Sequence, residues 1–190
     1  MEIYYCARAV FAKDYDRNDL NWDGYVSWQG LPDLEELITL DNMLCRDIMD
    51  FDQKNAEDWE FAVIREPYRT DFYKSLQYVL KKVADKERFN LLAVAIEPQE
   101  DCSNLVLEGF EFVGYDLLDE SFGLSSLTNC DGFIISYTPE DLAQYGLLRD
   151  FEKAYDVKKK LLEDNYDQGH EVTRVLAVWR HTTIGRKIDG

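Results

Sequence analysis

Lysine and arginine are absent from sixty consecutive residues of this chain, Phe89 to Leu148, although eleven acidic residues lie in the same stretch. About a quarter of an average chain is charged, with both signs interspersed, so this segment is unusually one-sided. We therefore expect a concentrated negative surface. Such a surface repels nucleic acids and anionic membranes, and it attracts basic proteins.

Cysteine and histidine are scarce, with four cysteines and two histidines. No CxxC pair and no cysteine–histidine cluster has zinc spacing, which argues against a zinc module. The glycines form neither a GxGxxG motif nor a P-loop. The N-terminus lacks the basic and apolar regions of a signal peptide, and no window approaches eighteen apolar residues. We expect a cytoplasmic protein with reduced cysteines, not bound to a membrane.

The chain has ample material for a hydrophobic core, because 46% of its 190 residues are hydrophobic and 14% are aromatic. We interpret residues 1–190 as a single globular domain. Its charge is uneven. Residues 1–150 contain 13 basic and 31 acidic residues, a net charge of −18, whereas residues 151–190 contain 8 basic and 7 acidic residues, a net charge of +1. The C-terminal segment is therefore near neutral.

Strands and helices alternate in the predicted order. We expect strands at residues 2–11, 59–64, 89–96, 109–118, 133–137 and 172–179. We expect helices from Asp33 to about residue 51, over 67–85, from Thr138 to an interruption at Gly146, and from about Leu148 to Leu162, and a long loop over 13–32. This order indicates an α+β fold, a single mixed β-sheet with helices packed on at least one face.

Two predicted helices carry an apolar stripe at helical spacing. In the helix at 67–85, the stripe predicts Leu76 and Leu80 as core residues. The C-terminal helix is expected to bury five side chains. These are Phe151, Ala154, Tyr155, Leu161 and Leu162.

The segment 19–27 is similar to the first half of an EF-hand calcium loop. Asp19, Asn21 and Asp23 supply oxygens at positions one, three and five, and a glycine follows at position six. Gly30 occupies position twelve, where the family has a bidentate glutamate. Two readings stay open: a calcium site on Asp19, Asn21 and Asp23, or a surface loop with no cofactor, in which Asp and Asn bond their own backbone.

Acidic pairs are frequent in this chain, for example Glu108 with Glu111, or Asp116 with Asp119 and Glu120. A glycosidase would need two such carboxyls facing each other across a cleft, and sequence alone does not place them so. We find no catalytic motif, and we expect a protein that is not an enzyme.

The function that these features favour is a non-catalytic acidic binding protein. Its concrete form is an inhibitor or immunity-type partner of a basic protein such as a nuclease toxin. The residues expected to face the partner are Glu97, Glu100, Asp101, Glu108, Glu111, Asp116, Asp119 and Glu120. We expect neutralising Asp116, Asp119 and Glu120 to leave the fold intact.

The alternative is a small-ligand-binding protein or an enzyme, with a pocket between sheet and helices. An exposed patch of acids over 97–131 would favour the binding protein, whereas buried, convergent acids would favour the pocket. The sequence sets no oligomeric state.

Overall fold

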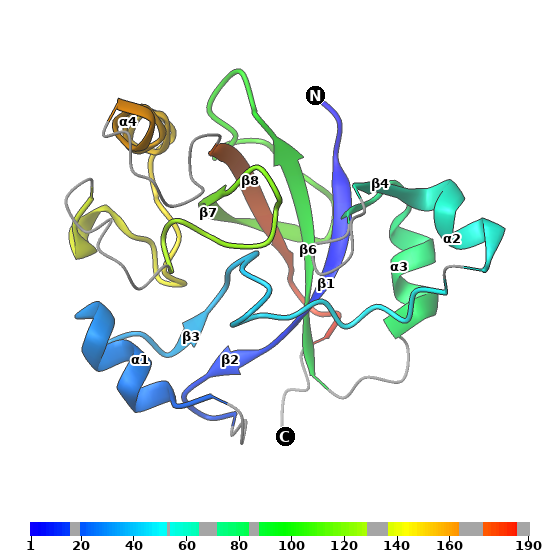
Figure 1. The fold of residues 1–190 in the computed structure, drawn as a ribbon, viewed down its shortest axis with the longest axis horizontal. Helices are drawn as coiled ribbons and strands as arrows, with labels where there is room; N and C mark the ends of the chain where they lie inside the picture. Colours follow the sequence, from blue (N-terminus) through cyan, green and yellow to red (C-terminus); the bar gives the residue numbers. More distant parts are fainter. Residues whose placement is uncertain are drawn as a thin grey trace.

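The computed structural model describes residues 1–15, 20–52, 54–64, 72–83, 88–128, 137–163 and 173–185. Its centre is a six-stranded sheet, drawn in Figure 1. The strand order is β4 (Ala62–Ile64), β5 (Phe72–Tyr73), β1 (Tyr4–Ala9), β6 (Phe89–Ile96), β8 (Arg174–His181) and β7 (Phe110–Leu118). A separate two-stranded pair joins β2 (Phe11–Ala12) to β3 (Glu36–Leu37). The fold is α+β, as predicted, but every strand pairing described is antiparallel, so the sheet is not mixed.

The central strand β6 has the longest apolar run. Seven of its eight residues are buried, and it pairs with β1 on one side and β8 on the other. Ala93 lies opposite both Tyr5 and Trp179. A strand that is covered on both faces needs apolar side chains on both, which confirms the prediction for 89–96.

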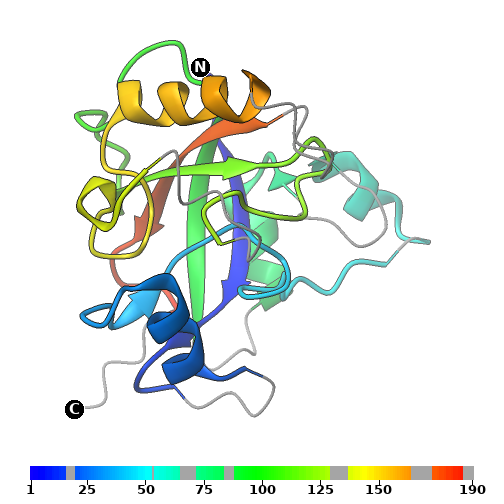
Figure 2. The same cartoon turned by 60° about the vertical axis from the view of Figure 1, so that its left-hand side comes forward.

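Helices cover the sheet from two places. Helix α3 (Leu76–Val83) packs against β1 and β5, and α4 (Phe151–Glu163) packs against β7 and β8, as Figures 1 and 2 show. Two further helices, α1 (Trp22–Gln29) and α2 (Ala56–Phe61), and the 3-10 turn η2 (Pro139–Asp141) lie outside the sheet. The prediction of helices on at least one face is confirmed.

The helix expected to start at Asp33 does not form. Residues 33–51 contain β3 and a series of turns instead. Within these turns, side chains of Asp41, Asn42 and Asp47 accept hydrogen bonds from backbone N–H groups two or five residues further on. Such local bonds give the backbone an alternative to the helical ladder. They explain why the spacing of the apolar residues wrongly predicted a helix here.

The expected loop at 13–32 contains α1. The side chain of Asn21 caps this helix by accepting from the Gly24 N–H at 3.0 Å, and Gly30 ends it with a left-handed φ of 69°. Asparagine before a helix and glycine after it are standard end signals. The prediction of a loop was therefore wrong for Trp22–Gln29, and 16–19 lie outside the described residues.

Two further boundaries differ from the prediction. The strand expected at 59–64 starts as the end of α2, and only Ala62–Ile64 form β4. The helix expected at 67–85 begins at Leu76, after the short strand β5. Residues 65–71 and 84–87, like 133–136 of another expected strand, lie outside the described residues.

Burial of the apolar stripes is only partly as predicted. In α3, Val79 and Val83 are fully buried, whereas Leu76 and Leu80 are only partly buried. In α4, Leu161 is 5% exposed, but its neighbour Leu162 is 46% exposed and lies outside the core. Ala154 is fully buried, as predicted, and so is Val157, which the prediction left out.

These two leucines test the packing of α4. We expect Leu161→Ala to cost about 2–5 kcal/mol of unfolding free energy, because a buried side chain leaves a cavity. Leu162→Ala should change it by less than about 0.5 kcal/mol. Both changes alter helix propensity equally, so urea unfolding isolates the burial effect. Equal losses would place both side chains in the same environment and contradict this register.

Candidate functional site

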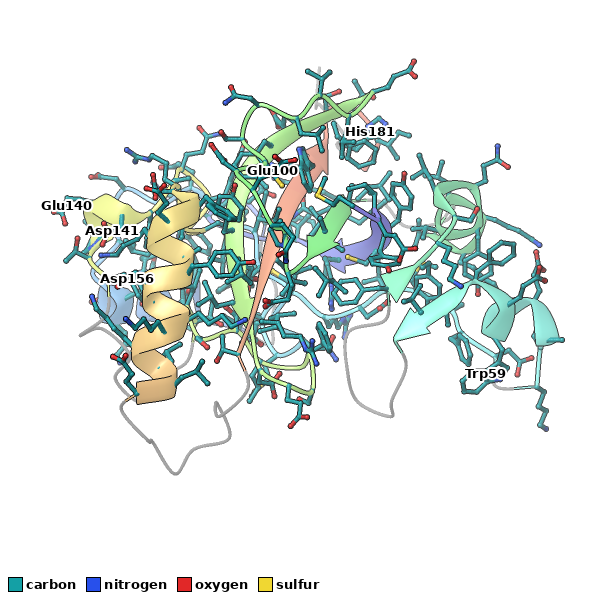
Figure 3. All side chains as sticks on the ribbon, turned by 90° about the horizontal axis from the view of Figure 1, so that it is seen from above. Trp59, Glu100, Glu140, Asp141, Asp156 and His181 are labelled. Atoms are coloured by element: carbon teal, nitrogen blue, oxygen red, sulfur yellow. The ribbon has the colours of Figure 1, made fainter. Side chains whose placement is uncertain are left out.

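The structure distributes the predicted partner-facing acids over separate places. Glu100, Asp101 and Glu108 are exposed in the connection between β6 and β7. Glu120 is exposed beyond the other end of β7 from Glu108, and this nine-residue strand spans about 30 Å, whereas Asp101 lies partway along it, bonded to the Tyr115 hydroxyl. The acids of 97–120 therefore do not form one continuous patch. Figure 3 shows Glu100 apart from Glu140, Asp141 and Asp156, which belong to η2 and α4.

Several of these acids already have partners inside the fold. Glu97 forms a 2.7 Å ion pair with Lys158 of α4 and accepts a hydrogen bond from the Val175 N–H at 2.7 Å. Glu111 is partly buried in β7. By contrast, Lys81 and Lys82 pair with Glu57 and Asp58, so they neutralise none of the acids at 97–120.

Asp116 is fully buried, so its predicted place on an exposed surface was wrong. Its Oδ2 accepts from the Thr39 hydroxyl at 3.0 Å and the Leu40 N–H at 2.7 Å. Its Oδ1 accepts from the Ser125 hydroxyl at 2.5 Å and the Leu117 N–H at 2.9 Å. Burial raises the pKa of Asp116 above its ordinary value, and the four hydrogen bonds oppose that shift.

Asp119 is also buried, which corrects its predicted exposure. Its carboxylate accepts from the Gly123 N–H at 2.8 Å and the Leu124 N–H at 3.1 Å, and from the Ser121 hydroxyl. These bonds hold the turn that follows β7. Both buried acids therefore shape the backbone, and neither is available to a partner.

A third buried carboxylate, Asp41, lies next to this network. Its Oδ1 accepts from the Met43 N–H at 2.8 Å, and its Oδ2 from the Thr128 hydroxyl at 2.6 Å. Ser125 connects the two acids, because its N–H donates to Asp41 at 3.3 Å and its hydroxyl to Asp116. Within the described residues, no ion pair joins either carboxylate to a cation.

Asp41 also lines an open groove of about 340 Å³ beside α1, which we call the α1 groove. Figure 2 shows α1 below the segments that follow β3 and β7, and these three parts form its walls. The lining residues are Gly24, Tyr25, Trp28, Asp41, Met43, Leu44, Leu124 and Thr128. Apart from Asp41 and Thr128, the walls are apolar or aromatic.

Three large apolar side chains of the α1 groove are open to solvent. Trp28 is 42% exposed, Met43 is 74% exposed and Leu124 is 36% exposed. Helix α1 has only Val26 buried, and its Trp22 and Tyr25 rings pack on Phe11 of the core, whereas Trp28 is left exposed. Exposed apolar side chains gathered at one place mark binding surfaces in soluble proteins, and we take the α1 groove as the candidate functional site.

The buried acids impose a negative potential on this groove. Burial raises the pKa of the Tyr25 hydroxyl well above its ordinary value, and the nearby charges of Asp41 and Asp116 contribute to the rise. Burial also raises the pKa of Tyr137 to about 12, again with a contribution from Asp116. Burial is the main cause of both shifts, and the nearby carboxylates add to it because a phenol resists ionisation near negative charge.

The calcium candidate has a different local structure from the one expected. Asn21 is the N-cap of α1, and Asp23 lies in the first turn of that helix. The backbone from 22 onward is thus helical, not the loop that an EF-hand requires. Asp19 lies outside the described residues. Among the residues that the structure does describe, no cluster of three or more His, Cys, Asp or Glu side chains is placed to hold a metal ion.

No family model matches this chain, and neither a curated protein nor a solved structure is significantly similar to it. None of the helices in the described part of the chain is both long and apolar enough to cross a bilayer. Sequence reasoning missed Trp28, Met43, Leu124 and Asp41 as site residues. The cap signals at Asn21 and Gly30 were available to find α1, but nothing in the local sequence indicates that Trp28 faces solvent.

The hydrogen bonds to Asp116 predict that Asp116→Asn destabilises the fold. Each carboxylate oxygen accepts two bonds, so the amide NH₂ group faces two donors whichever way it turns. A buried donor without an acceptor costs about 1–3 kcal/mol, and we expect a total loss of at least about 2 kcal/mol. Thermal or urea unfolding measures it.

Glu120→Gln is the matched control. It removes the same charge from an exposed position four residues after Asp116. It should change the unfolding free energy by less than about 0.5 kcal/mol. A variant at Asp116 as stable as this control would mean that the carboxylate is not held by these four bonds.

Proposed function

We propose that this chain is a non-catalytic acidic binding protein, that its partner is a basic protein, and that the α1 groove is part of the contact. One observation carries the proposal: exposed Trp28, Met43 and Leu124 surround a groove in which the buried carboxylate of Asp41 is part of the wall.

The composition of the groove suits protein recognition. Tryptophan, tyrosine and methionine are enriched in the centres of interfaces, and a few such residues supply most of the binding energy. Methionine also adapts its shape to different surfaces. Trp28 and Met43 are thus the residues whose removal is expected to weaken a complex most.

The charge of the chain favours a basic partner. The formal net charge is −17, and exposed Asp23 and Glu120 belong to the same segments as the groove walls. Complementary charge raises association rates and discriminates against acidic partners. An exposed aromatic centre with an acidic periphery therefore fits a basic protein surface with an apolar centre.

The geometry of the buried acids gives little support to catalysis. General acid–base chemistry requires a carboxyl group within reach of substrate. Asp116 is 0% exposed and its oxygens accept four hydrogen bonds. Asp119 is turned onto its own loop. These acids lie close together, but their oxygens bond to groups of the fold and are not open to a substrate.

The specific form that we favour is an inhibitor of immunity type against a basic nuclease. A nuclease binds phosphates with lysine and arginine, and a protein that offers carboxylates instead can occupy that surface. The same carboxylates repel nucleic acid, so the inhibitor would not compete for the substrate of its target.

The volume of the groove favours a second function, binding of a small organic cation. About 340 Å³ lies at the lower end of the range of small-molecule pockets. In that case the free cation would bind to the groove by itself, and no protein partner would be needed.

Affinity capture tests the primary proposal. The immobilised chain should retain a protein of net positive charge from lysate of the producing cells at low salt and release it as salt rises, because exposed charges are screened. Trp28→Ala should reduce affinity for the purified partner by at least about 2 kcal/mol, as expected for an interface hot spot. Calorimetry or surface plasmon resonance measures this loss.

Trp59→Ala is the matched control, because Trp59 is 51% exposed and lies on α2, on the opposite side of the molecule from α1 in Figure 1. Binding should be unchanged in this variant. Retention of an acidic partner, or an equal loss from both tryptophan variants, would reject the proposed surface.

A further inference from the structure

We infer that the α1 groove is a receptor for one lysine side chain of the basic partner, with the aliphatic stem against the apolar walls and the ammonium group directed at Asp41. This inference rests on the proposed function and assigns the chemical group that the groove recognises.

The first argument concerns the walls. The ring centroids of Tyr25 and Trp28 lie 6.5 Å apart with their planes 50° to one another. A cation is attracted to an aromatic face within about 6 Å of the ring centroid, most strongly by tryptophan. An ammonium group placed beside this ring pair can therefore lie near both rings, while Leu44 and Leu124 contact the methylene chain behind it.

The second argument concerns the carboxylate. All the groups bonded to the Asp41 oxygens are donors, namely the N–H groups of Met43 and Ser125 and the hydroxyl of Thr128. An ionised carboxylate has about four acceptor sites, so the described residues fill three and leave one. The remaining site belongs to Oδ1, which among the described residues accepts from Met43 alone.

The number of free sites favours lysine over arginine. A guanidinium group reaches its best affinity by bonding both oxygens of a carboxylate at once. Oδ2 of Asp41 already accepts from Ser125 and Thr128, so a bidentate pair cannot form without breaking one of these bonds. A lysine ammonium needs only one acceptor and can satisfy its other donors with water or with aromatic faces.

The third argument is charge complementarity. Asp41 and Asp116 lie together, and the described residues form no ion pair with either of them. A cation that enters the groove would meet uncompensated negative charge in a site partly shielded from water, where electrostatic attraction is stronger than at an open surface. An uncharged side chain of the same shape would gain only the apolar contact.

Short capped peptides provide the test, because they separate charge from shape without altering the protein. Four peptides, acetyl-Gly-Gly-X-Gly-Gly-amide, carry lysine, arginine, norleucine or acetyl-lysine at X. Indole N–H resonances of the four tryptophans are recorded by NMR during titration of the wild-type chain. Trp28→Phe assigns the Trp28 signal, and Trp59 serves as an internal control.

The lysine peptide should shift the Trp28 resonance in a saturable manner and leave that of Trp59 unchanged. Norleucine and acetyl-lysine should bind about tenfold more weakly or worse, since they lack the charge-assisted hydrogen bond. Arginine should bind more weakly than lysine. In Trp28→Ala, a two-dimensional spectrum of the backbone amides should show lysine binding reduced by about tenfold or more.

Equal binding of lysine and norleucine would overturn the inference, because the groove would then recognise only apolar shape. Tighter binding of arginine would overturn the choice of lysine. These outcomes are distinct from failure of the proposed function, in which capture of a basic partner does not depend on Trp28 at all.

Discussion

The buried carboxylate of Asp116 is the interaction on which the site depends. It accepts hydrogen bonds from the segment after β3, through Thr39 and Leu40, and from the loop after β7, through Ser125. The partners are separated by up to 77 residues in the chain. One side chain of β7 thereby joins the two segments that, with α1, form the walls of the groove. It acts together with the hydrogen bonds from Ser125 and Thr128 to Asp41 and from the Asn42 N–H to the Gly123 carbonyl, which join the same two segments.

The same acid shows that negative charge in a sequence has two separate uses. Asp116 and Asp119 organise backbone N–H groups in the interior, whereas Glu100 and Glu120 face solvent. Composition cannot separate these uses, because the residue types are identical. What separates them is the pattern of donors around each acid, and these donors come from distant parts of the chain.

Elements with strong local signals were predictable. The apolar run of β6 and the stripe of α4 gave a correct fold class, because burial on both faces or on one helical side dictates residue type at every position. The segment 33–51 failed for the opposite reason, since bonds from Asp41, Asn42 and Asp47 to the local backbone override its apolar spacing. Sequence spacing does not report such competition.

The α1 groove was beyond sequence reasoning for a further reason. Its walls come from α1, from residues 41–44 and from residues 124–128, so no window of the chain contains the site. Trp28 in the sequence is simply one aromatic residue among many. Its place in the groove depends on two things that the sequence does not show. Trp28 is exposed on α1, a helix with a single buried residue, and tertiary folding places Asp41 beside it.

The position of β7 at the edge of the sheet has a consequence for biosynthesis. Within the six-stranded sheet, β7 pairs with β8 alone, and β8 is the last strand of the sheet to leave the ribosome. Asp116 can therefore be fixed in place only after residues 174–181 have emerged and paired with β6. Loop closure over such separations is slow compared with local helix formation. The groove is thus completed only after β8 has been synthesised, and a chain that stops before residue 174 would carry the acidic sequence without a finished groove.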